Sequence, residues 1–181
     1  MNPVARDDAR QTSAAGGEPL RALGLTLRAE ADTDGPFMLD LYRSVRAEEL
    51  ALAPWTPAQK DAFLADQLRL QRADWSQRFA RADRWVIEHD ARPIGRLYLD
   101  RASAGWRLID IGLMKEARDR GFGRALLGWI QAEAARARVE AVVLLVLVHN
   151  PAAARLYRRF GFVDDGPPDG PYRAMTWRVA G

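Results

Sequence analysis

The chain has 181 residues, of which 48% are hydrophobic and 28% charged, and its formal net charge is +3. This composition is typical of a globular protein with about one domain and excludes a disordered or fibrous chain. Because the sequence contains no cysteine, it excludes disulfides, a thiolate metal site and a cysteine nucleophile. Its longest apolar run, residues 141–148, is far shorter than the ~20 residues that span a bilayer. Residues 1–20 lack the apolar segment of a signal peptide, so we expect a cytoplasmic protein that contacts no membrane.

Arginine supplies almost all of the positive charge, because Lys60 and Lys115 are the two lysines among 27 basic residues. The net charge is small, and no cluster of consecutive basic residues is present. We therefore expect no nucleic-acid partner, although a basic pocket for a polyanionic small ligand stays open. No residue pattern calls for a metal.

The first half of the chain predicts one strand and a long helical region. Residues 1–20 are polar and aperiodic, and we expect a loose tail before a single domain over residues 21–181. Residues 23–30 alternate as in a strand, and residues 33–81 have helical periodicity. Within the helical region, the sequence from Thr56 to Gln59 is a capping box that starts a helix. Its aromatic residues pack in the core or line a cleft: Tyr42, Trp55, Phe63 and Trp75.

The second half alternates strands and helices. Three strands are expected at residues 84–89, 94–101 and 106–114, followed by a helix from Gly121. The continuous apolar run at 141–148 is typical of a strand covered on both faces. Asn150 and Pro151 are suited to cap and begin a second helix, which should end near Gly161. Short strands at 162–165 and 172–179 complete a mixed sheet, largely antiparallel at first, with a β-α-β unit inside it.

The junction before the helix at Gly121 has the chemistry of an anion site. It reads RDRGFGRA over residues 118–125, and Gly121 and Gly123 would let the backbone approach a ligand closely. A helix N-terminus offers unpaired N–H groups and the positive end of a dipole, and Arg118, Arg120 and Arg124 add full charges. Two linked phosphates would fit. The alternative is a glycine-assisted turn with solvated arginines.

A second block follows the next strand and reads N-x-x-A-x-x-L-Y-x-x-x-G-F from Asn150 to Phe162. The first block contributes R-x-x-G-x-G at Arg118, Gly121 and Gly123. In this order, the two blocks resemble those of the GNAT superfamily, the acyl-CoA-dependent N-acetyltransferases. The resemblance covers roughly residues 23–179. It implies an α/β (α+β) fold with a mixed, mostly antiparallel sheet of about seven strands, helices on both faces and a splayed pair of parallel strands.

The resemblance also implies site residues. Acetyl-CoA would be the co-substrate, and its thioester would lie between the splayed strands. Tyr157 would protonate the leaving thiolate, which a positioned phenol can do; the alternative is a core tyrosine with a satisfied hydroxyl. Asn150 would bind the pantetheine arm, or would only cap its helix. The cofactor-binding residues expected by this resemblance are Leu113, Lys115, Arg118, Asp119, Arg120, Gly121, Phe122, Gly123, Arg124, Ala125, Asn150 and Ala153.

Two positions depart from the family pattern. Asp119 stands where the family often has glycine, and Lys115 stands where it often has proline. A carboxylate that pointed toward phosphates would weaken their binding, so we expect Asp119 to point outward, toward Arg120 or Arg124.

The acceptor amine needs a group that removes its proton, because freeing an amine of pKa near ~10.4 at pH 7 costs about 4–5 kcal/mol. Asp110, His149, and Glu48 or Glu49 are the candidate bases. By simple alternation, Asp110 would share a face with Trp106 and Leu108. Its alternative role is a structural ion pair with a nearby arginine.

These features together predict an N-acetyltransferase in which a primary amine, on a small molecule or a peptide, attacks the thioester directly in a ternary complex. The alternative is an acyl-CoA-binding regulatory module with weak or no catalysis. A homodimer is expected by analogy with the family alone.

Overall fold

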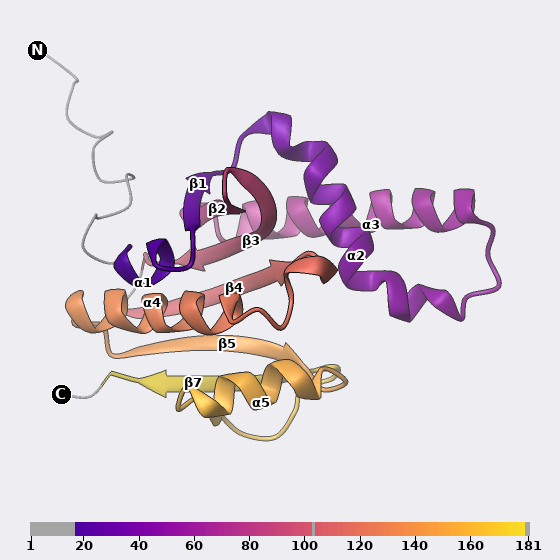
Figure 1. The fold of residues 1–181 in the computed structure, drawn as a ribbon. Helices are drawn as coiled ribbons and strands as arrows, with labels where there is room; N and C mark the ends of the chain where they lie inside the picture. Colours follow the sequence, from indigo (N-terminus) through magenta and orange to yellow (C-terminus); the bar gives the residue numbers. More distant parts are fainter. Residues whose placement is uncertain (1–16, 103, 180–181) are drawn as a thin grey trace, which may run out of the picture.

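The computed structural model describes residues 17–102 and 104–179, except the side chain of Glu48. Within these ranges, seven strands form one sheet in the order β1-β2-β3-β4-β5-β7-β6 (Figure 1). All neighbouring pairs are antiparallel except β4 and β5. The strands are β1 Leu25–Ala29, β2 Asp83–His89, β3 Arg92–Asp100, β4 Gly105–Leu113, β5 Ala141–Leu147, β6 Val163–Asp164 and β7 Tyr172–Arg178.

A short helix, α1 Glu18–Arg21, precedes the first strand. Its Leu20 is buried in the core, so ordered structure begins before the expected boundary at residue 21. The rest of the expected tail, residues 1–16, lies outside the described residues. The aperiodic composition of this segment hid a helix of one turn, which tertiary packing of one leucine stabilises.

Two long helices cover one face of the sheet. A 3-10 turn at Asp32–Asp34 leads into α2 Gly35–Ala51, and α3 Pro57–Arg78 follows. The predicted capping box is present, because the Thr56 hydroxyl accepts from the Gln59 amide while the Gln59 side chain accepts from the Thr56 amide. Both helices extend beyond the sheet in Figure 1. Their buried side chains pack with Val86 of β2: Met38, Leu41, Tyr42, Leu50, Leu64 and Leu68.

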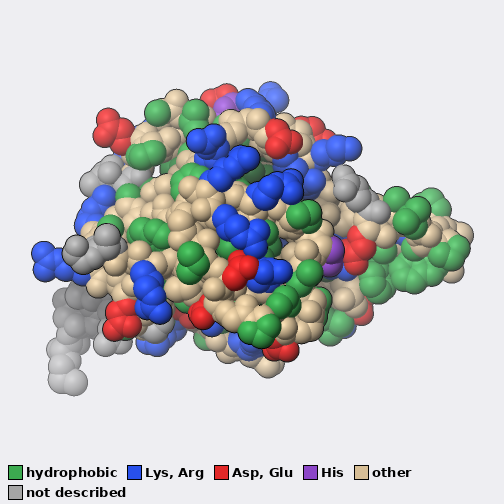
Figure 2. All heavy atoms as spheres, turned by 90° about the horizontal axis from the view of Figure 1, so that it is seen from below, with side chains coloured by type: hydrophobic (Ala, Val, Ile, Leu, Met, Phe, Trp, Pro, Cys, Tyr) green, Lys and Arg blue, Asp and Glu red, His purple; other side chains and the backbone are tan. Residues whose placement is uncertain are grey.

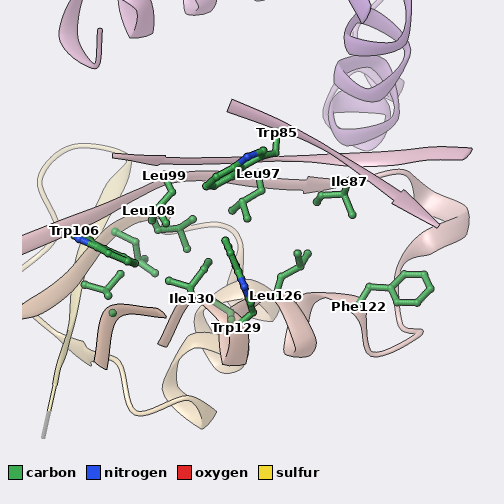
Figure 3. Close-up of a cluster of buried hydrophobic side chains, with 14 of the residues drawn as sticks. Trp85, Ile87, Leu97, Leu99, Trp106, Leu108, Phe122, Leu126, Trp129 and Ile130 are labelled. Carbon is green, nitrogen blue, oxygen red and sulfur yellow. The ribbon is translucent and has the colours of Figure 1, made fainter. Parts of the chain in front are cut away.

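The other face carries α4 Phe122–Arg136 and α5 Pro151–Arg159. The predicted apolar stripe of α4, including Leu126 and Ile130, is fully buried against the sheet. Figure 3 shows Trp129 of α4 pointing toward Trp85 of β2, and the two rings meet edge to face at 5.7 Å. This layer holds the larger of the two cores and fixes where α4 begins relative to the strands.

The parallel strands β4 and β5 run together only at their start. Residues 105–108 of β4 pair with residues 141–144 of β5, and no ladder joins the strands beyond that point. β5 stays paired with β7 along its whole length, and β4 stays paired with β3 to Leu113. The sheet therefore opens between the C-terminal halves of its two central parallel strands, as expected from the resemblance.

A bulge in β4 lies next to this opening. Tyr98 of β3 pairs with Asp110, but the next residue, Leu99, pairs with Leu108, so Ile109 is an extra residue. An extra residue reverses which face the following side chains occupy. The bulge therefore decides which side chains of β4 lie on the face of the sheet that α2 and α3 cover.

Candidate active site

The N-terminus of α4 is open for a ligand. Gly121 is its N-cap, with φ of +84°, and no side chain caps the helix. The first helical hydrogen bond runs from the Ala125 amide to the Gly121 oxygen, so the amides of Phe122, Gly123 and Arg124 precede it. A Cβ added at Gly121 would meet no atom within 4 Å. The arrangement supplies three directed N–H donors and free space, which suits a phosphate.

Exposed arginines surround this helix end. Arg120 and Arg124 are exposed, and the Arg120 guanidinium lies 4.8 Å from the centre of the Phe122 ring. The Phe122 side chain itself is buried, so only its main chain can meet a ligand. The neighbouring helix α5 adds exposed Arg155 and Arg159, whereas Arg158 pairs with Asp164. Figure 2 shows basic side chains, which are arginines in β7 and α5, gathered on this face.

Asp119 occupies its glycine-like position for a conformational reason. Its φ is +59°, in the left-handed region, which aspartate tolerates better than most residues. The side chain is exposed, which agrees with an outward orientation. The expected pairing with Arg120 or Arg124 is wrong, because neither arginine forms an ion pair with Asp119 in the described part of the chain. A left-handed residue between Arg118 and Arg120 directs its side chain into solvent instead.

The Arg118 guanidinium donates hydrogen bonds to main-chain oxygens. Its Nε donates to the Leu113 oxygen and its Nη2 to the Ser44 oxygen of α2, both at 3.1 Å. The Ser44 hydroxyl also accepts from the Lys115 amide at 3.0 Å. The carbonyl of Leu113 and the amide of Lys115, which belong to two of the expected cofactor-binding residues, therefore already have partners. The ammonium of exposed Lys115 forms no ion pair with any described residue.

The backbone of β4 still offers groups to the opening. Because the Met114 amide donates to the Ile94 oxygen, alternate residues of β4 pair with β3. The residues between them, Ile111 and Leu113, direct their N–H and C=O groups away from β3. With β5 parted, the Leu113 amide and both groups of Ile111 face the opening.

Helix α5 brings Tyr157 to the same region. Asn150 caps the helix, because its side chain accepts a hydrogen bond from the Ala153 amide at 3.1 Å. The Ala153 N–H therefore already has a partner. Tyr157 is half-buried and packs on Phe162, with ring centres 5.8 Å apart. Its hydroxyl has no hydrogen-bond partner among the described residues. Burial and then the Asp110 charge raise the pKa of Tyr157, so the phenol stays protonated and available as a donor.

Asp110 lies on the opposite face from the one expected. The simple alternation that grouped it with Trp106 and Leu108 is wrong because the Ile109 bulge intervenes. Asp110 instead shares a face with Tyr98, whose ring contacts Trp75 of α3. It accepts from Arg96 Nε at 2.6 Å, so the alternative role, a structural ion pair, is confirmed. Its side chain remains 28% exposed, and its charge acts on Tyr157 of α5.

The other candidate bases with described side chains, His149 and Glu49, make no contact among the described residues that indicates a role in catalysis. His149 is exposed in the turn after β5, directly before Asn150. Glu49 is exposed on α2 and pairs with Arg46 at 2.6 Å. Glu48 lies in α2, and its side chain is outside the description. Among the four aromatic residues expected in core or cleft, Tyr42 is buried, whereas Trp55 and Phe63 contact each other near the α2–α3 connection.

Two residues that sequence reasoning missed organise the site, Ser44 and Arg96. Arg96 is buried in β3, stacked 5.2 Å from the rings of both Trp75 and Tyr98, and also donates to Gln71 of α3. An arginine inside an otherwise apolar strand was the available signal. Ser44 gave none, because a serine on a helix surface is unremarkable. Across the described residues, no cluster of His, Asp or Glu is arranged to hold a metal, and no helix is long and apolar enough to cross a membrane.

Solved structures with a similar fold include several acetyltransferases. PaiA N-acetyltransferase of Thermoplasma acidophilum, solved with coenzyme A, is similar with a TM-score of 0.66 and 16% identity over 86% of this chain and 99% of the other. Spermidine N-acetyltransferase of Vibrio cholerae, solved with CoA and spermine, is similar with a TM-score of 0.59 and 22% identity over 86% and 95%. The ribosomal-protein-S18-alanine N-acetyltransferase of Escherichia coli is similar with a TM-score of 0.58 and 18% identity over 86% and 92%. At these identities, the likeness concerns the fold.

The family assignment comes from the sequence itself. Residues 44–162, more than half of the chain, match the model of the acetyltransferase (GNAT) family. The chain therefore belongs to the GNAT acetyltransferase family. The matched segment contains the open end of α4, the parted strands and Tyr157.

Proposed function

We propose that the protein is an N-acetyltransferase that moves the acetyl group of acetyl-CoA to a primary amine by direct attack in a ternary complex. The observation that carries the proposal is the parting of β4 and β5 beside the uncapped N-terminus of α4. The open amides of Phe122, Gly123 and Arg124, with Arg120 nearby, fit a pyrophosphate. The groups of Ile111 and the Leu113 amide fit the polar arm that connects phosphate to thioester.

Bound acetyl-CoA would supply an activated acyl group with a thiolate as leaving group. Residues of the chain would then accept one proton and donate another. Asp110, reached through the opening, or a water beside it would accept the proton that the amine loses as the C–N bond forms. Tyr157 would donate its proton to sulfur as the C–S bond breaks, and would recover one from solvent. Because the sequence has no cysteine, an acyl-cysteine intermediate is not available.

The raised pKa of Tyr157 limits what this residue can do. An ordinary thiol has a pKa near ~8.5 and a phenol near ~10, so complete proton transfer to a free thiolate is unfavourable. Tyr157 therefore acts while negative charge develops on sulfur, when a short hydrogen bond is worth most. Such a donor typically contributes 10²–10⁴-fold to rate.

The experiment is a comparison of wild type with Tyr157→Phe on a panel of primary amines. We expect a fall in kcat of about 10²-fold or more, with the Kd for acetyl-CoA changed less than about threefold. Unchanged turnover on every accepted amine would remove the proton-donor role. Tight binding of acetyl-CoA with no product from any amine would instead favour the regulatory acyl-CoA-binding module. A cytoplasmic location and a homodimer remain predictions.

A further inference from the structure

A patch of exposed apolar side chains lies where the two parallel strands part. Leu145 is 49% exposed although β5 lies in the middle of the sheet, and Tyr172, opposite Leu147 on β7, is 44% exposed. Large hydrophobic residues of a central strand are normally covered. Together with half-buried Leu147, these two residues form the acceptor patch: Leu145, Leu147 and Tyr172.

The patch shares a face with Asp110. Leu144 and Leu108 pair and both point into the core with α4, so Leu145 points to the opposite face. The Ile109 bulge brings Asp110 to that same face. Helices α4 and α5 pack on the other side, and α2 packs on β3 and β4. The apolar patch is therefore continuous with the opening that presents the carboxylate.

Helix α2 bounds the patch on its other side. Burial raises the pKa of Tyr42 of α2, Arg46 and Arg96 oppose this shift, and Glu49 and Tyr172 add to it, so Tyr172 of the patch lies near α2. Asp110 pairs with Arg96 and Glu49 pairs with Arg46, whereas exposed Asp169, whose main chain bridges to Tyr172, has no ion pair among the described residues. A polycation would have to desolvate its further ammonium groups against this apolar patch, whereas a single amine with an apolar body would find both a carboxylate, Asp110, and a surface to cover.

We infer that the acceptor is a monoamine whose apolar or aromatic body lies across Leu145 and Tyr172 while its nitrogen is directed at Asp110. This inference rests on the proposed function and names the substrate class of that site. Leu145 and Tyr172 then determine specificity and do no chemistry. The binding energy comes from apolar area, so it should grow with the length of the acceptor.

The test is a homologous series of amines from propylamine to hexylamine, with 2-phenylethylamine and spermidine, at saturating acetyl-CoA. We expect kcat/KM to rise about threefold to fourfold for each methylene that the patch covers. We also expect 2-phenylethylamine to exceed spermidine. Leu145→Gln should reduce the ratio of hexylamine to propylamine. Val163→Gln is the matched control, because Val163 is 63% exposed on the edge strand β6 and should leave the ratio as in wild type.

Three results would overturn the inference while leaving the acetyltransferase proposal intact. They are a kcat/KM that stays constant along the amine series, a preference for spermidine, and equal effects of the two variants. Absence of product from every amine, with acetyl-CoA bound, would remove the proposed function itself. Sedimentation of both variants gives a second reading. A dimer that dissociates only in Leu145→Gln would show that a second copy covers the patch, which also overturns the inference.

Discussion

Arg118 donates through Nη2 to the main-chain oxygen of Ser44, and this contact joins the loop before α4 to the middle of α2. The Ser44 hydroxyl accepts from the Lys115 amide, so one residue of α2 receives two bonds from that loop. The same arginine also holds the Leu113 oxygen at the end of β4. Arg118 therefore connects β4, the loop before α4, and α2. Through these hydrogen bonds, α2 fixes the position of the proposed phosphate loop.

From these hydrogen bonds we predict that Arg118→Ala lowers the free energy of unfolding by about 1–3 kcal/mol, because two hydrogen bonds from a charged group are lost. It should also weaken CoA binding, and Ser44→Ala should do so in the same direction by releasing the Lys115 amide. The measurements are thermal unfolding and calorimetric titration of CoA at two salt concentrations. If Arg118 instead binds phosphate directly, Ser44→Ala will leave the Kd unchanged and Arg118→Ala alone will reduce the salt dependence.

Asp119 combines a left-handed backbone with a negative charge in a loop proposed to bind phosphates. We expect Asp119→Asn to tighten CoA binding several-fold with little change in stability, because asparagine tolerates the same φ but carries no charge. Asp119→Gly should tighten binding similarly. Its effect on the free energy of unfolding should stay within about 1 kcal/mol, because relief of the left-handed strain opposes the added entropy of the unfolded chain. Equal Kd values for wild type and Asn would show that the carboxylate faces solvent without effect.

The sequence was sufficient wherever the determinants are local. The capping box at Thr56 and the Asn150–Pro151 start of α5 are formed by residues within one turn, and both are present as predicted. The uncapped N-terminus of α4 at Gly121 also depends on local backbone geometry, and its use as an anion site stays a prediction. Patterns of this kind specify an element and its end together.

Other features depend on contacts between distant segments, and the sequence could not supply them. The Ile109 bulge leaves no mark in the run WRLIDIGL, yet it moves Asp110 to the other face. The partner of Arg118 lies 74 residues earlier in the chain. Left-handed φ at Asp119 explains a departure from the family pattern that appeared to concern charge alone. In each case, tertiary geometry decided what a side chain does.

The Arg96–Asp110 pair complicates any test of Asp110 as the base. Arg96 has a side chain only 6% exposed, and its Nη1 has no hydrogen-bond partner among the described residues. Desolvation opposes its charge, but Asp110 and neighbouring Tyr98 and Glu30 keep the pKa of Arg96 raised. Removing Asp110 would leave a buried charge uncompensated, which typically costs about 3–5 kcal/mol.

We therefore expect Asp110→Asn to destabilise the fold as well as to slow turnover. The double variant Arg96→Met with Asp110→Asn should recover most of the stability, because the uncompensated charge is gone. Activity measured in the double variant then isolates chemistry: a rate that stays low would support Asp110 as the base. Recovery of rate together with stability would assign Asp110 to structure alone. Unfolding curves in urea should accompany each rate measurement.

A second ion pair, far from the site, predicts how acid affects stability. Asp34 accepts from both terminal nitrogens of Arg28 at 2.9 Å and from the Ala31 amide at 2.8 Å. The hydrogen bond from Arg28 is the main cause that lowers the pKa of Asp34 below its usual value. A lowered pKa in the folded state means that the stabilisation is complete above the unfolded-state pKa of ~3.9 and is lost as pH falls through the folded value.

Asp34→Asn should therefore lower the free energy of unfolding by about 1 kcal/mol near neutral pH, a modest value because the Arg28 side chain is 40% exposed. The difference from wild type should shrink below about pH 4 as the carboxyl of the wild type protonates. Asp66→Asn is the matched control, because its pair with Arg69 is more than half exposed on both sides. That control should change stability by less than about 0.5 kcal/mol at either pH. A difference between wild type and Asp34→Asn that stays constant from neutral to acid pH would show that the Asp34 charge contributes nothing.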